Sequence, residues 1–421
     1  EENLPLLASL HPSVRRTLGT SPVELLDEVS MVVLSPGVPV TVPLVVEARR
    51  RGIPVISEVE LAFRSMKGTV MAITGSNGKS TTTALVGEIL LEAGDRPVVA
   101  GNIGQALTSV VDDQEHTYVV ELSSFQLETV ESFHANVAVL LNITPDHLDR
   151  YASMDEYAAA KYRIFRNQVA EDRAIVNADD ELTKNPPTAA EVWRFSSRGE
   201  VVRGAWLAGD DLVLDVDGRA ERISRGSLSL QGQANVENAL ASWLAARAAG
   251  VSTEAVERAF RSFTGLPHRM RLVADIGGVK WINDSKGTNV DATLKSLEGF
   301  PDGSIVLILG GRDKRGDFER MRPVVTGKVR AILTIGAAAD RISEALQGTA
   351  VIIACEEMRE AVLRAASLAT AGDSVLLSPA CASFDQYKNF EKRGEHFERL
   401  VQENVGKVGP DRSSEREAGK P

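Results

Sequence analysis

The chain has 421 residues, of which 43% are hydrophobic and 25% are charged, and its 58 acidic and 47 basic residues leave a net charge of −11. This length allows about three domains of ordinary size, each with its own hydrophobic core. The acidic balance argues against a general nucleic-acid binder, which needs a basic surface, so we expect no nucleic-acid partner.

The sequence lacks the usual features of secreted and membrane proteins. Its only cysteines are Cys355 and Cys381, too few for a disulfide framework. It has no secretory signal and no uninterrupted run of about 20 apolar residues. We therefore expect a cytoplasmic protein with no membrane partner. Cys381 in SPACASFDQ is either a nucleophile or a small semi-buried thiol, and the second interpretation is favoured because no base is identifiable beside it.

The N-terminal part predicts a small α/β unit. We expect strands at 31–34 and 53–56 and helices at 42–51 and 57–64, the last capped by Ser57 with Glu60 three residues later. Ser35, Pro36 and Gly37 follow the first strand, where open α/β sheets bind ligands. Two strands are few for an independent sheet, so we expect that a first strand and its turn are missing or lie outside this chain.

Residues 69–83, with the sequence TVMAITGSNGKSTTT, are the stretch around which the chain is organised. A buried strand ends at Gly75, and a helix with apolar residues at helical spacing opens after Gly78. The free N–H groups and the dipole of a helix N-terminus favour an anion. Both glycines allow the backbone to approach phosphate, Lys79 adds positive charge, and Ser80 or Thr81 offers a hydroxyl to Mg²⁺. The stretch therefore predicts a nucleotide-phosphate site.

This phosphate loop departs from the general pattern. That pattern requires glycine five residues before the Gly-Lys pair, where this chain has Ile73, so the loop is a shortened variant. A plain glycine turn before a helix is the alternative. Such a turn would not need a lysine followed by four hydroxyl residues in the first helical turn.

From residue 69 onward, strands and helices alternate, which predicts a mainly parallel sheet with helices on both faces. The strands expected at 98–100, 118–122 and 137–141 each run into polar or glycine residues, at 101–102, 123–126 and 142–150. If these strands are parallel, their C-terminal ends meet at one edge together with the phosphate loop. That edge is the predicted active site.

Two features of this edge suit a metal-dependent reaction. Glu121 closes the strand at 118–122, where a carboxylate can hold Mg²⁺ against a triphosphate, although a solvated charge is the alternative. The loop at 142–150 carries two acids, a histidine and an arginine within its last five residues. Such a loop is either functional or a surface salt-bridge loop.

A capping box formed by Ser153 and Glu156 predicts a helix that carries Lys161. Spacing alone favours an ordinary exposed helix lysine at this position. Short β-like runs follow at 174–176, 192–195, 205–207, 212–216 and 222–223, with a hairpin turn at Asp217-Gly218.

The predicted helix at 235–249 brings Asn235 and Asn238 to one face near its start. Their amides can hold a purine edge or cap the helix. We place a domain boundary after Gly265, where a second α/β block begins. Its strands at 279–282, 304–309, 331–335, 351–353 and 374–378 predict a doubly wound sheet. Residues 406–421 are charged without apolar periodicity, which predicts a disordered tail.

Nine motifs follow one another along the chain: TGSNGKSTTT, GNIG, ELSSFQLE, NITPDHLDR, the lysine of AAAKYRIF, LPHR, NDSKGTNVDAT, GGRDK and SPACASFDQYKNFEKRG. With this set the chain resembles the Mur ligases, from about residue 31 to about residue 401. The segment SPACASFDQ is similar to that of the D-glutamate-adding type.

The resemblance implies an α/β fold of three domains. These are a small, incomplete Rossmann-like domain at 1–57 for a uridine nucleotide, a central phosphate-loop ATPase domain at 58–265 and a doubly wound C-terminal domain at 266–421 for the amino acid. It also implies an ATP-dependent amide ligase of peptidoglycan precursor synthesis. Its two substrates besides ATP would be UDP-N-acetylmuramoyl-L-alanine and D-glutamate, joined through an acyl phosphate. We expect a monomer.

The resemblance also implies the site residues. Catalysis would depend on Lys79, Glu121, His147 and Lys161. Two Mg²⁺ ions would be held by Ser80, Glu121, His147 and Lys161, the last as a carbamate. ATP would contact Gly75, Ser76, Asn77, Gly78, Lys79, Ser80, Thr81, Thr82, Asn235, Asn238, Arg269 and Asp284. The uridine-linked substrate would contact Ser35, Pro36, Gly37 and Asn102, and D-glutamate would contact Thr288, Lys314, Ser383, Phe384 and Phe390.

Two positions depart from the family pattern. The family's opening strand and glycine-containing turn have no counterpart before Glu1, which leaves a truncated chain, a misassigned gene start or a different mode of nucleotide binding. Gly287 stands where the family more often has alanine, a change that we expect to be minor. The competing hypotheses are another ATP-dependent amide ligase, such as a folylpolyglutamate synthase or a different Mur ligase, and an ATP-binding regulatory protein that makes no bond.

Overall fold

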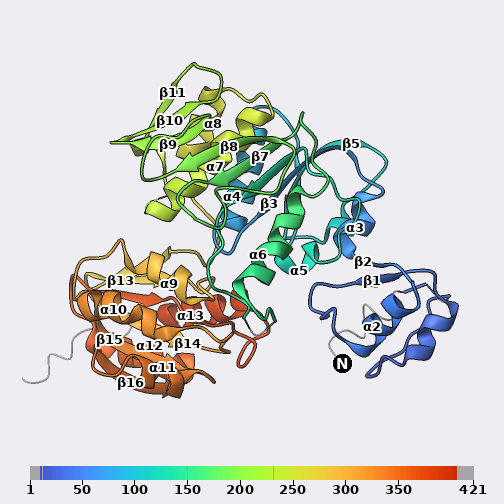
Figure 1. Ribbon diagram of the computed structural model, residues 1–421. Helices are drawn as coiled ribbons and strands as arrows, with labels where there is room; N and C mark the ends of the chain where they lie inside the picture. Colours follow the sequence, from blue (N-terminus) through green and yellow to red (C-terminus); the bar gives the residue numbers. More distant parts are fainter. Residues whose placement is uncertain (1–9, 12, 149, 231, 405–421) are drawn as a thin grey trace, which may run out of the picture.

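The computed structural model describes residues 10–11, 13–148, 150–230 and 232–404, and these residues form three β-sheets. We call the parts built on them the N-terminal unit (η1 to β2), the central unit (α3 to α8) and the C-terminal unit (β12 to α13). In Figure 1 the N-terminal unit lies beside the central unit, and the C-terminal unit, in orange, lies below the central unit. The predicted α/β class is confirmed. The tail predicted at 406–421 lies outside the described residues.

The N-terminal unit contains a two-stranded parallel sheet in which Val32 pairs with Val55. Its elements are η1 (Val23–Glu28), β1 (Val32–Leu34), α2 (Pro43–Arg50) and β2 (Val55–Ser57). Leu26, Leu34 and Val45 are buried in a small core of its own. The strands and the helix expected in this part of the sequence are therefore confirmed.

Helix α3 (Glu58–Phe63) follows β2 directly, and Ser57 caps it as predicted by accepting the N–H of Glu60 at 3.1 Å. The carboxylate of Glu60 does not serve the cap. It is buried and accepts the backbone N–H groups of Glu131, at 2.9 Å, and Phe133, at 3.0 Å. The hydrogen bonds of the buried Glu60 therefore join α3 to the loop that precedes β6 of the central sheet.

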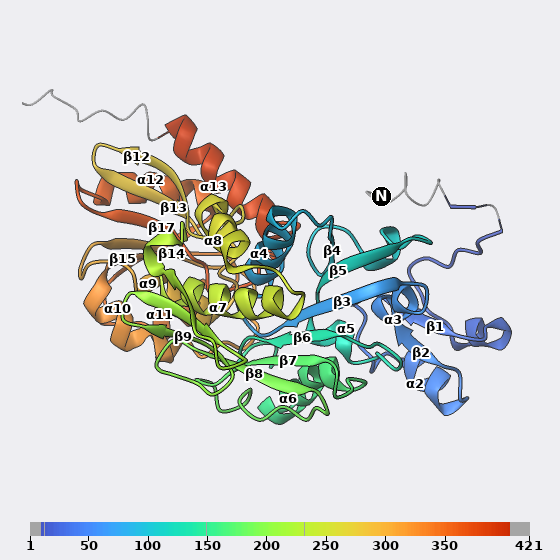
Figure 2. The ribbon, with the colours of Figure 1, turned by 90° about the horizontal axis from the view of Figure 1, so that it is seen from above.

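The nine strands of the central unit follow the order β11-β10-β9-β8-β7-β6-β3-β5-β4. Strands β3 to β9 are parallel, while β10 and β11 are antiparallel and form the hairpin predicted at Asp217-Gly218. Figure 2 shows β5, β3, β6, β7 and β8 side by side. The bounds are β3 (Lys67–Thr74), β4 (Val98–Gly101), β5 (Glu115–Glu121), β6 (Val137–Leu140), β7 (Arg173–Asn177), β8 (Glu191–Ser196), β9 (Gly204–Ala208), β10 (Asp211–Asp215) and β11 (Glu221–Ser224).

Helices cover both faces of this sheet, as the alternating pattern predicts. One face packs against α4 (Lys79–Glu92), α7 (Gln233–Ala248) and α8 (Thr253–Ser262). The other face packs against α3, α5 (Ser124–Leu127) and α6 (Met154–Tyr162). Short 3-10 turns lie at η2 (Leu107–Ser109), η3 (Arg163–Phe165) and η4 (Arg225–Ser227).

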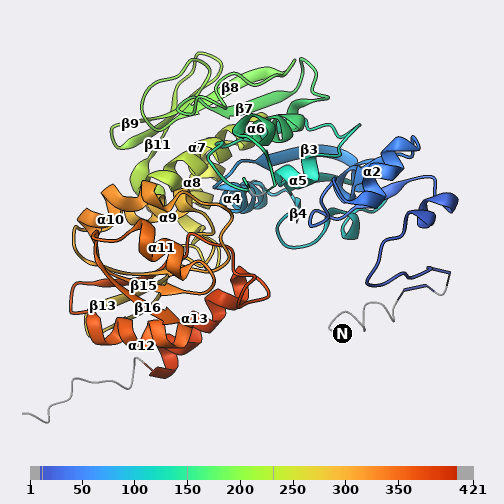
Figure 3. The same ribbon diagram turned by 60° about the horizontal axis from the view of Figure 1, so that its bottom comes forward.

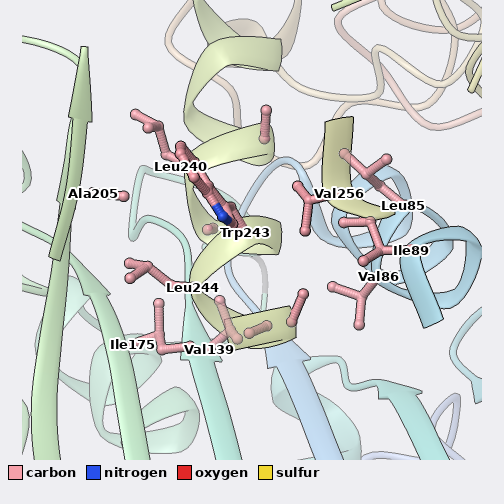
Figure 4. Close-up of a cluster of buried hydrophobic side chains, with 14 of the residues drawn as sticks. Leu85, Val86, Ile89, Val139, Ile175, Ala205, Leu240, Trp243, Leu244 and Val256 are labelled. Carbon is pink, nitrogen blue, oxygen red and sulfur yellow. The ribbon is translucent and has the colours of Figure 1, made fainter. Parts of the chain in front are cut away.

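The core between the sheet and α7 is fully packed (Figure 4). Leu240 and Trp243 of α7 are 0% and 1% exposed and lie in one cluster with Ile175 of β7 and Ile89 of α4. Such a core leaves no room for a polar substitution and loses contacts when a side chain is shortened.

Leu240→Ala should lower the free energy of unfolding of the central unit by about 2–5 kcal/mol, because it leaves a cavity in this cluster. Calorimetric or urea unfolding of the purified protein measures the change. The matched control is Leu91→Ala on α4, where the side chain is 54% exposed and the expected change is within about 0.5 kcal/mol. Equal changes in the two variants would contradict the packing described.

The C-terminal unit is a six-stranded sheet in the order β12-β13-β17-β14-β15-β16, in which all strands but β12 are parallel. Its strands are β12 (Arg271–Ile276), β13 (Val279–Asn283), β14 (Ile305–Gly310), β15 (Val329–Ile335), β16 (Val351–Glu356) and β17 (Ser374–Leu377). Its helices are α9 (Val290–Leu297), η5 (Phe318–Met321), α10 (Arg322–Lys328), α11 (Ala339–Ala345), α12 (Met358–Leu368) and α13 (Phe390–Asn404). Nowhere in the described part of the chain does a helix have the length and apolar character needed to cross a membrane.

Strand β12 was not predicted. It is an edge strand that pairs antiparallel with β13 across Gly277-Gly278, and its side chains are largely exposed or half-buried. A strand with little burial carries a weak hydrophobic pattern. The Gly-Gly pair, with φ of 62° and 78°, was the available hairpin signal.

Candidate active site

The phosphate loop lies where the sequence predicts it, between the C-terminal end of β3 and the first turn of α4. Gly78 precedes α4 with φ of 88°, and a Cβ atom there would lie 2.4 Å from Oδ1 of Asn238. Both facts require glycine at this position. A hydrogen bond to the neighbouring loop also supports this turn, because Oδ1 of Asn142 accepts the backbone N–H of Asn77 at 2.8 Å. The protein itself therefore stabilises the conformation of the turn.

Two lysines converge on one carbonyl of this loop. The ammonium groups of Lys79 and Lys161 each donate to the carbonyl oxygen of Gly75 at 2.8 Å, and Lys79 also donates to that of Ser76 at 2.9 Å. Lys161 is 1% exposed and lies 4.5 Å from the ring centre of Tyr157. The interpretation of Lys161 as an exposed helix lysine is therefore wrong. Burial, together with the charge of Lys79, lowers the pKa of Lys161 well below its usual value.

Glu121 closes β5 and is 1% exposed, so it is not a solvated charge. Its Oε1 accepts the amide N–H of Asn102 at 2.9 Å. Its Oε2 is buried and, within the described residues, has no hydrogen-bond partner. A buried carboxylate oxygen without a donor fits a cation, and oxygen is the ligand that Mg²⁺ prefers.

The loop at 142–150 contains the predicted metal ligand His147. The residue has φ of 56°, and its ring lies 4.7 Å from that of Phe125 in an edge contact. Burial and the nearby charge of Lys314 lower its pKa, with Asp146 opposing, so the imidazole is neutral at pH 7 and can offer a lone pair. Asp146 is buried, so this segment is not a surface salt-bridge loop.

The predicted magnesium residues combine a hydroxyl, a carboxylate, an imidazole and a lysine, namely Ser80, Glu121, His147 and Lys161. Among the residues that the structure describes, no group of three or more His, Cys, Asp or Glu side chains is arranged to hold a metal.

A cavity of about 720 Å³ lies between the central and C-terminal units. This volume is typical of a small-molecule site. Its walls include seven of the residues predicted for ATP, which are Asn77, Gly78, Thr81, Asn235, Asn238, Arg269 and Asp284. The tertiary structure thus brings together residues from three distant parts of the sequence.

One contact in this cavity joins the central unit to the segment that leads into the C-terminal unit, and two more lie within the central unit. Arg269 donates to the hydroxyl of Thr81 in the phosphate loop. Asn238 accepts the hydroxyl of Thr82 at 3.3 Å and donates to Asn235 at 3.2 Å. Because Gly232 is the cap of α7, the interpretation of the two asparagines as helix caps is wrong.

Asp284 lies at the end of β13 and faces the same cavity. Its Oδ2 accepts the hydroxyls of Ser296 and Ser378, both at 2.7 Å. Burial raises the pKa of Asp284, and these hydroxyls and Arg269 oppose the rise.

The residues predicted for the uridine-linked substrate come from two separate parts of the chain. Ser35, Pro36 and Gly37 form the turn after β1, and the carbonyl of Pro36 accepts a guanidinium N–H of Arg150 at 3.3 Å. The fourth residue, Asn102, lies against Glu121. The turn after β1 is therefore joined to the loop that carries His147.

The residues predicted for D-glutamate gather at the strand ends of the C-terminal unit. Lys314 forms an ion pair with Asp146 at 2.7 Å, and Ser383 is buried. Phe390 lies below the ammonium group of Lys286 at 4.7 Å, and Thr288 is half-buried in the same loop as Lys286. Phe384, in contrast, is 64% exposed.

Family models match most of the chain. A Mur ligase middle domain matches residues 73–246, a Mur ligase glutamate ligase domain matches 268–381, and a MurD-like N-terminal domain matches 1–57. The chain is 47% identical to the UDP-N-acetylmuramoylalanine--D-glutamate ligase of Acidobacterium capsulatum, over 88% of this chain and 82% of that protein. It is 46% identical to the ligase of the same name from Anaeromyxobacter dehalogenans, over 95% and 89%.

The chain belongs to the Mur ligase family. Mur ligases are ATP-dependent ligases of peptidoglycan precursor synthesis, so the protein is an enzyme of that class. The predicted family is thereby confirmed.

Solved structures of Mur ligases share the fold. A pseudomurein peptide ligase of Methanothermus fervidus matches with a TM-score of 0.64 at 17% identity, over 91% of this chain and 89% of that one. A MurF ligase of Thermotoga maritima, solved in complex with ADP, matches with a TM-score of 0.63 at 18% identity, over 85% and 91%. The three-part architecture is therefore the Mur ligase architecture.

Reasoning from the sequence missed three polar residues of the site. Lys286 lines the cavity, and burial lowers its pKa to about 8. Asn289 donates to Asp146 at 3.0 Å, and Tyr157 lies 3.1 Å from the hydroxyl of Ser76. Lys286 and Asn289 both stand in the motif NDSKGTN, so the clustering of polar residues after β13 was the available signal.

Proposed function

We propose that the protein joins D-glutamate to UDP-N-acetylmuramoyl-L-alanine, with conversion of ATP to ADP and phosphate. The observation that carries this proposal is the ion pair between Lys314 and Asp146, because it brings the predicted amino-acid site against the loop beside the phosphate lysines. The names of relatives at 43–47% identity, UDP-N-acetylmuramoylalanine--D-glutamate ligases, support the same substrates.

ATP would lie in the cavity of about 720 Å³, with its phosphates over the loop that begins at Gly75. Asn235 and Asn238 would contact the base, and Arg269 and Asp284 would contact the nucleotide from the C-terminal unit. Lys79 would then leave its two carbonyl partners and stabilise the charge that develops on the transferring phosphoryl group.

The reaction needs activation of a carboxylate, which is a poor electrophile at neutral pH. The carboxylate of the uridine-linked substrate attacks the γ-phosphorus of ATP, ADP leaves, and an acyl phosphate results. The amine of D-glutamate attacks the acyl carbon, and phosphate leaves from a tetrahedral intermediate. The chain contributes mainly by holding the reactants in position and by placing positive charge where negative charge develops.

Mg²⁺ would neutralise the phosphate oxygens during transfer. Ser80 and the unpaired oxygen of Glu121 would hold a first ion, and His147 and a carbamylated Lys161 would hold a second. A carbamate replaces the ammonium charge of Lys161 by a carboxylate-like anion, which oxygen-preferring metals accept. The burial of Lys161 supports this, because a buried amine is neutral more often than an exposed one.

The three domains proposed for this reaction are residues 1–57 for the uridine nucleotide, 58–265 for ATP and 266–421 for D-glutamate. Ser35, Pro36, Gly37 and Asn102 would contact the uridine-linked substrate. Thr288, Lys314, Ser383, Phe384 and Phe390 would contact D-glutamate, and the exposed ring of Phe384 would close over it. The proposal includes a monomer that acts in the cytoplasm.

The test is phosphate release from ATP and Mg²⁺ in the presence of UDP-N-acetylmuramoyl-L-alanine. We expect release that requires both this substrate and D-glutamate, and that L-glutamate or L-lysine does not replace D-glutamate. Release with a different amino acid would contradict the proposed substrate. ATP binding without any release would instead support the regulatory hypothesis.

A further inference from the structure

Asp146 is a buried carboxylate of the central unit that is bound from the C-terminal unit. The ammonium group of Lys314 lies 2.7 Å from Oδ1, and the amide of Asn289 donates to Oδ2 at 3.0 Å. The backbone N–H of His147 donates to Oδ1 at 2.9 Å. Each oxygen of this buried carboxylate therefore lies against a cation or a hydrogen-bond donor of the C-terminal unit, as a buried anion requires.

Asp146 lies next to the phosphate loop. The amide of Asn289 donates both to Oδ2 of Asp146, at 3.0 Å, and to Oδ1 of Asn77 in that loop, at 3.3 Å. The direct partner of Asp146, Lys314, belongs to the proposed amino-acid site. Asp146 thus stands between the phosphate loop and the proposed amino-acid site.

A free amino acid carries an ammonium group and a carboxylate on one carbon, so a site that selects it needs an anion beside a cation. The pair of Asp146 and Lys314 offers both charges side by side. The ammonium group of Lys314 lies against Oδ1 of Asp146. The α-amino group of an amino acid is also an ammonium group, so it can take the same position.

We infer that Asp146 binds the α-ammonium group of the incoming amino acid, while Lys314 moves from Asp146 to a carboxylate of the same molecule. This inference rests on the proposed function. The exchange leaves the buried Asp146 paired with an ammonium group before and after binding, which avoids the cost of an unpaired buried charge.

Asn289 is the partner that the exchange does not disturb. Its contact with Oδ2 of Asp146, and the N–H of His147 on Oδ1, keep the carboxylate plane in place while Lys314 leaves. Because Asn289 also contacts Asn77 of the phosphate loop, the amine bound to Asp146 would lie beside that loop.

The test is Asp146→Asn, which keeps the size of the side chain and removes its charge. The KM for D-glutamate should rise by at least about 30-fold, because one partner of a buried ion pair is lost. Formation of the acyl phosphate should persist. Hydroxylamine, a neutral nucleophile without a carboxylate, measures this step by attacking the acyl carbon to give a hydroxamate and phosphate. We expect a hydroxamate yield within about threefold of the wild-type yield.

The matched control is Asp373→Asn. It removes another buried carboxylate, which pairs with Arg330 of β15 at 2.6 Å and lies just before β17, at the end of the C-terminal sheet opposite Lys314; Figure 3 shows β15 within this sheet. The KM for D-glutamate should be unchanged in this variant. An unchanged KM in Asp146→Asn, or an equal rise in both variants, would overturn the inference, as would loss of the hydroxamate in Asp146→Asn alone. Absence of any D-glutamate product from the wild-type protein would instead contradict the proposed function.

Discussion

Lys79→Met should reduce the rate of ligation by on the order of 10³-fold. Lys79 is the charged side chain of the phosphate loop, and its ammonium group now donates to the carbonyls of Gly75 and Ser76 at 2.8 and 2.9 Å. Methionine has a similar length but cannot donate a hydrogen bond or stabilise the charge of a transferring phosphoryl group. Product formation at saturating ATP, followed by chromatography, measures the loss.

The fold should survive this change, because methionine replaces a half-buried cation by an apolar side chain of similar length. The melting temperature of Lys79→Met should therefore not fall below that of the wild-type protein. Lys67→Met is the matched control, since Lys67 lies at the other end of β3 and donates to the carbonyl of Asp113 in an exposed contact. Its rate should equal the wild-type rate. A loss of less than tenfold in Lys79→Met would contradict the role proposed for Lys79.

Lys161→Met should reduce the rate by on the order of 10²-fold to 10³-fold. The side chain is 1% exposed beside the phosphate loop, and burial lowers the pKa of its amine well below the usual value, which favours the neutral form that reacts with CO₂. The wild-type protein in ¹³C-bicarbonate should therefore give a carbamate carbonyl resonance in its ¹³C NMR spectrum. Lys161→Met should lack that resonance.

A surface lysine provides the control for this experiment. Lys184 is 40% exposed and pairs with Glu181 at 2.6 Å, so its amine is engaged by a carboxylate and should not form a carbamate. Lys184→Met should keep both the resonance and the rate. If the resonance persists in Lys161→Met, the modified group lies elsewhere and Lys161 does not hold metal as a carbamate.

The sequence predicts the order of strands and helices because their patterns are local. The apolar run before Gly75 and the spacing of apolar residues after Gly78 identify β3 and α4 without reference to the rest of the chain. The same holds for the polar residues after β5, β6 and β13. Parallel strands place these ends at one edge, so the location of the active site could be predicted.

Edge elements and burial could not be predicted in the same way. Strand β12 is exposed on much of its surface and so lacks the pattern of a buried strand. Lys161 has the spacing of an exposed helix residue, yet α6 packs against the phosphate loop and buries it. Burial depends on which neighbours the fold provides, and spacing within one helix does not contain that information.

The sequence by itself determined the phosphate loop, the two larger α/β blocks and the family, because each rests on residues that are close together in the chain. Only the tertiary structure decided which charged side chains lie next to one another. It left one oxygen of Glu121 without a donor among the described residues, and it joined Asp146 to Lys314 across 168 positions, from 146 to 314. Such pairs arise from the packing of one unit on another, and the free energy of a buried charge depends on its partners and its distance from water.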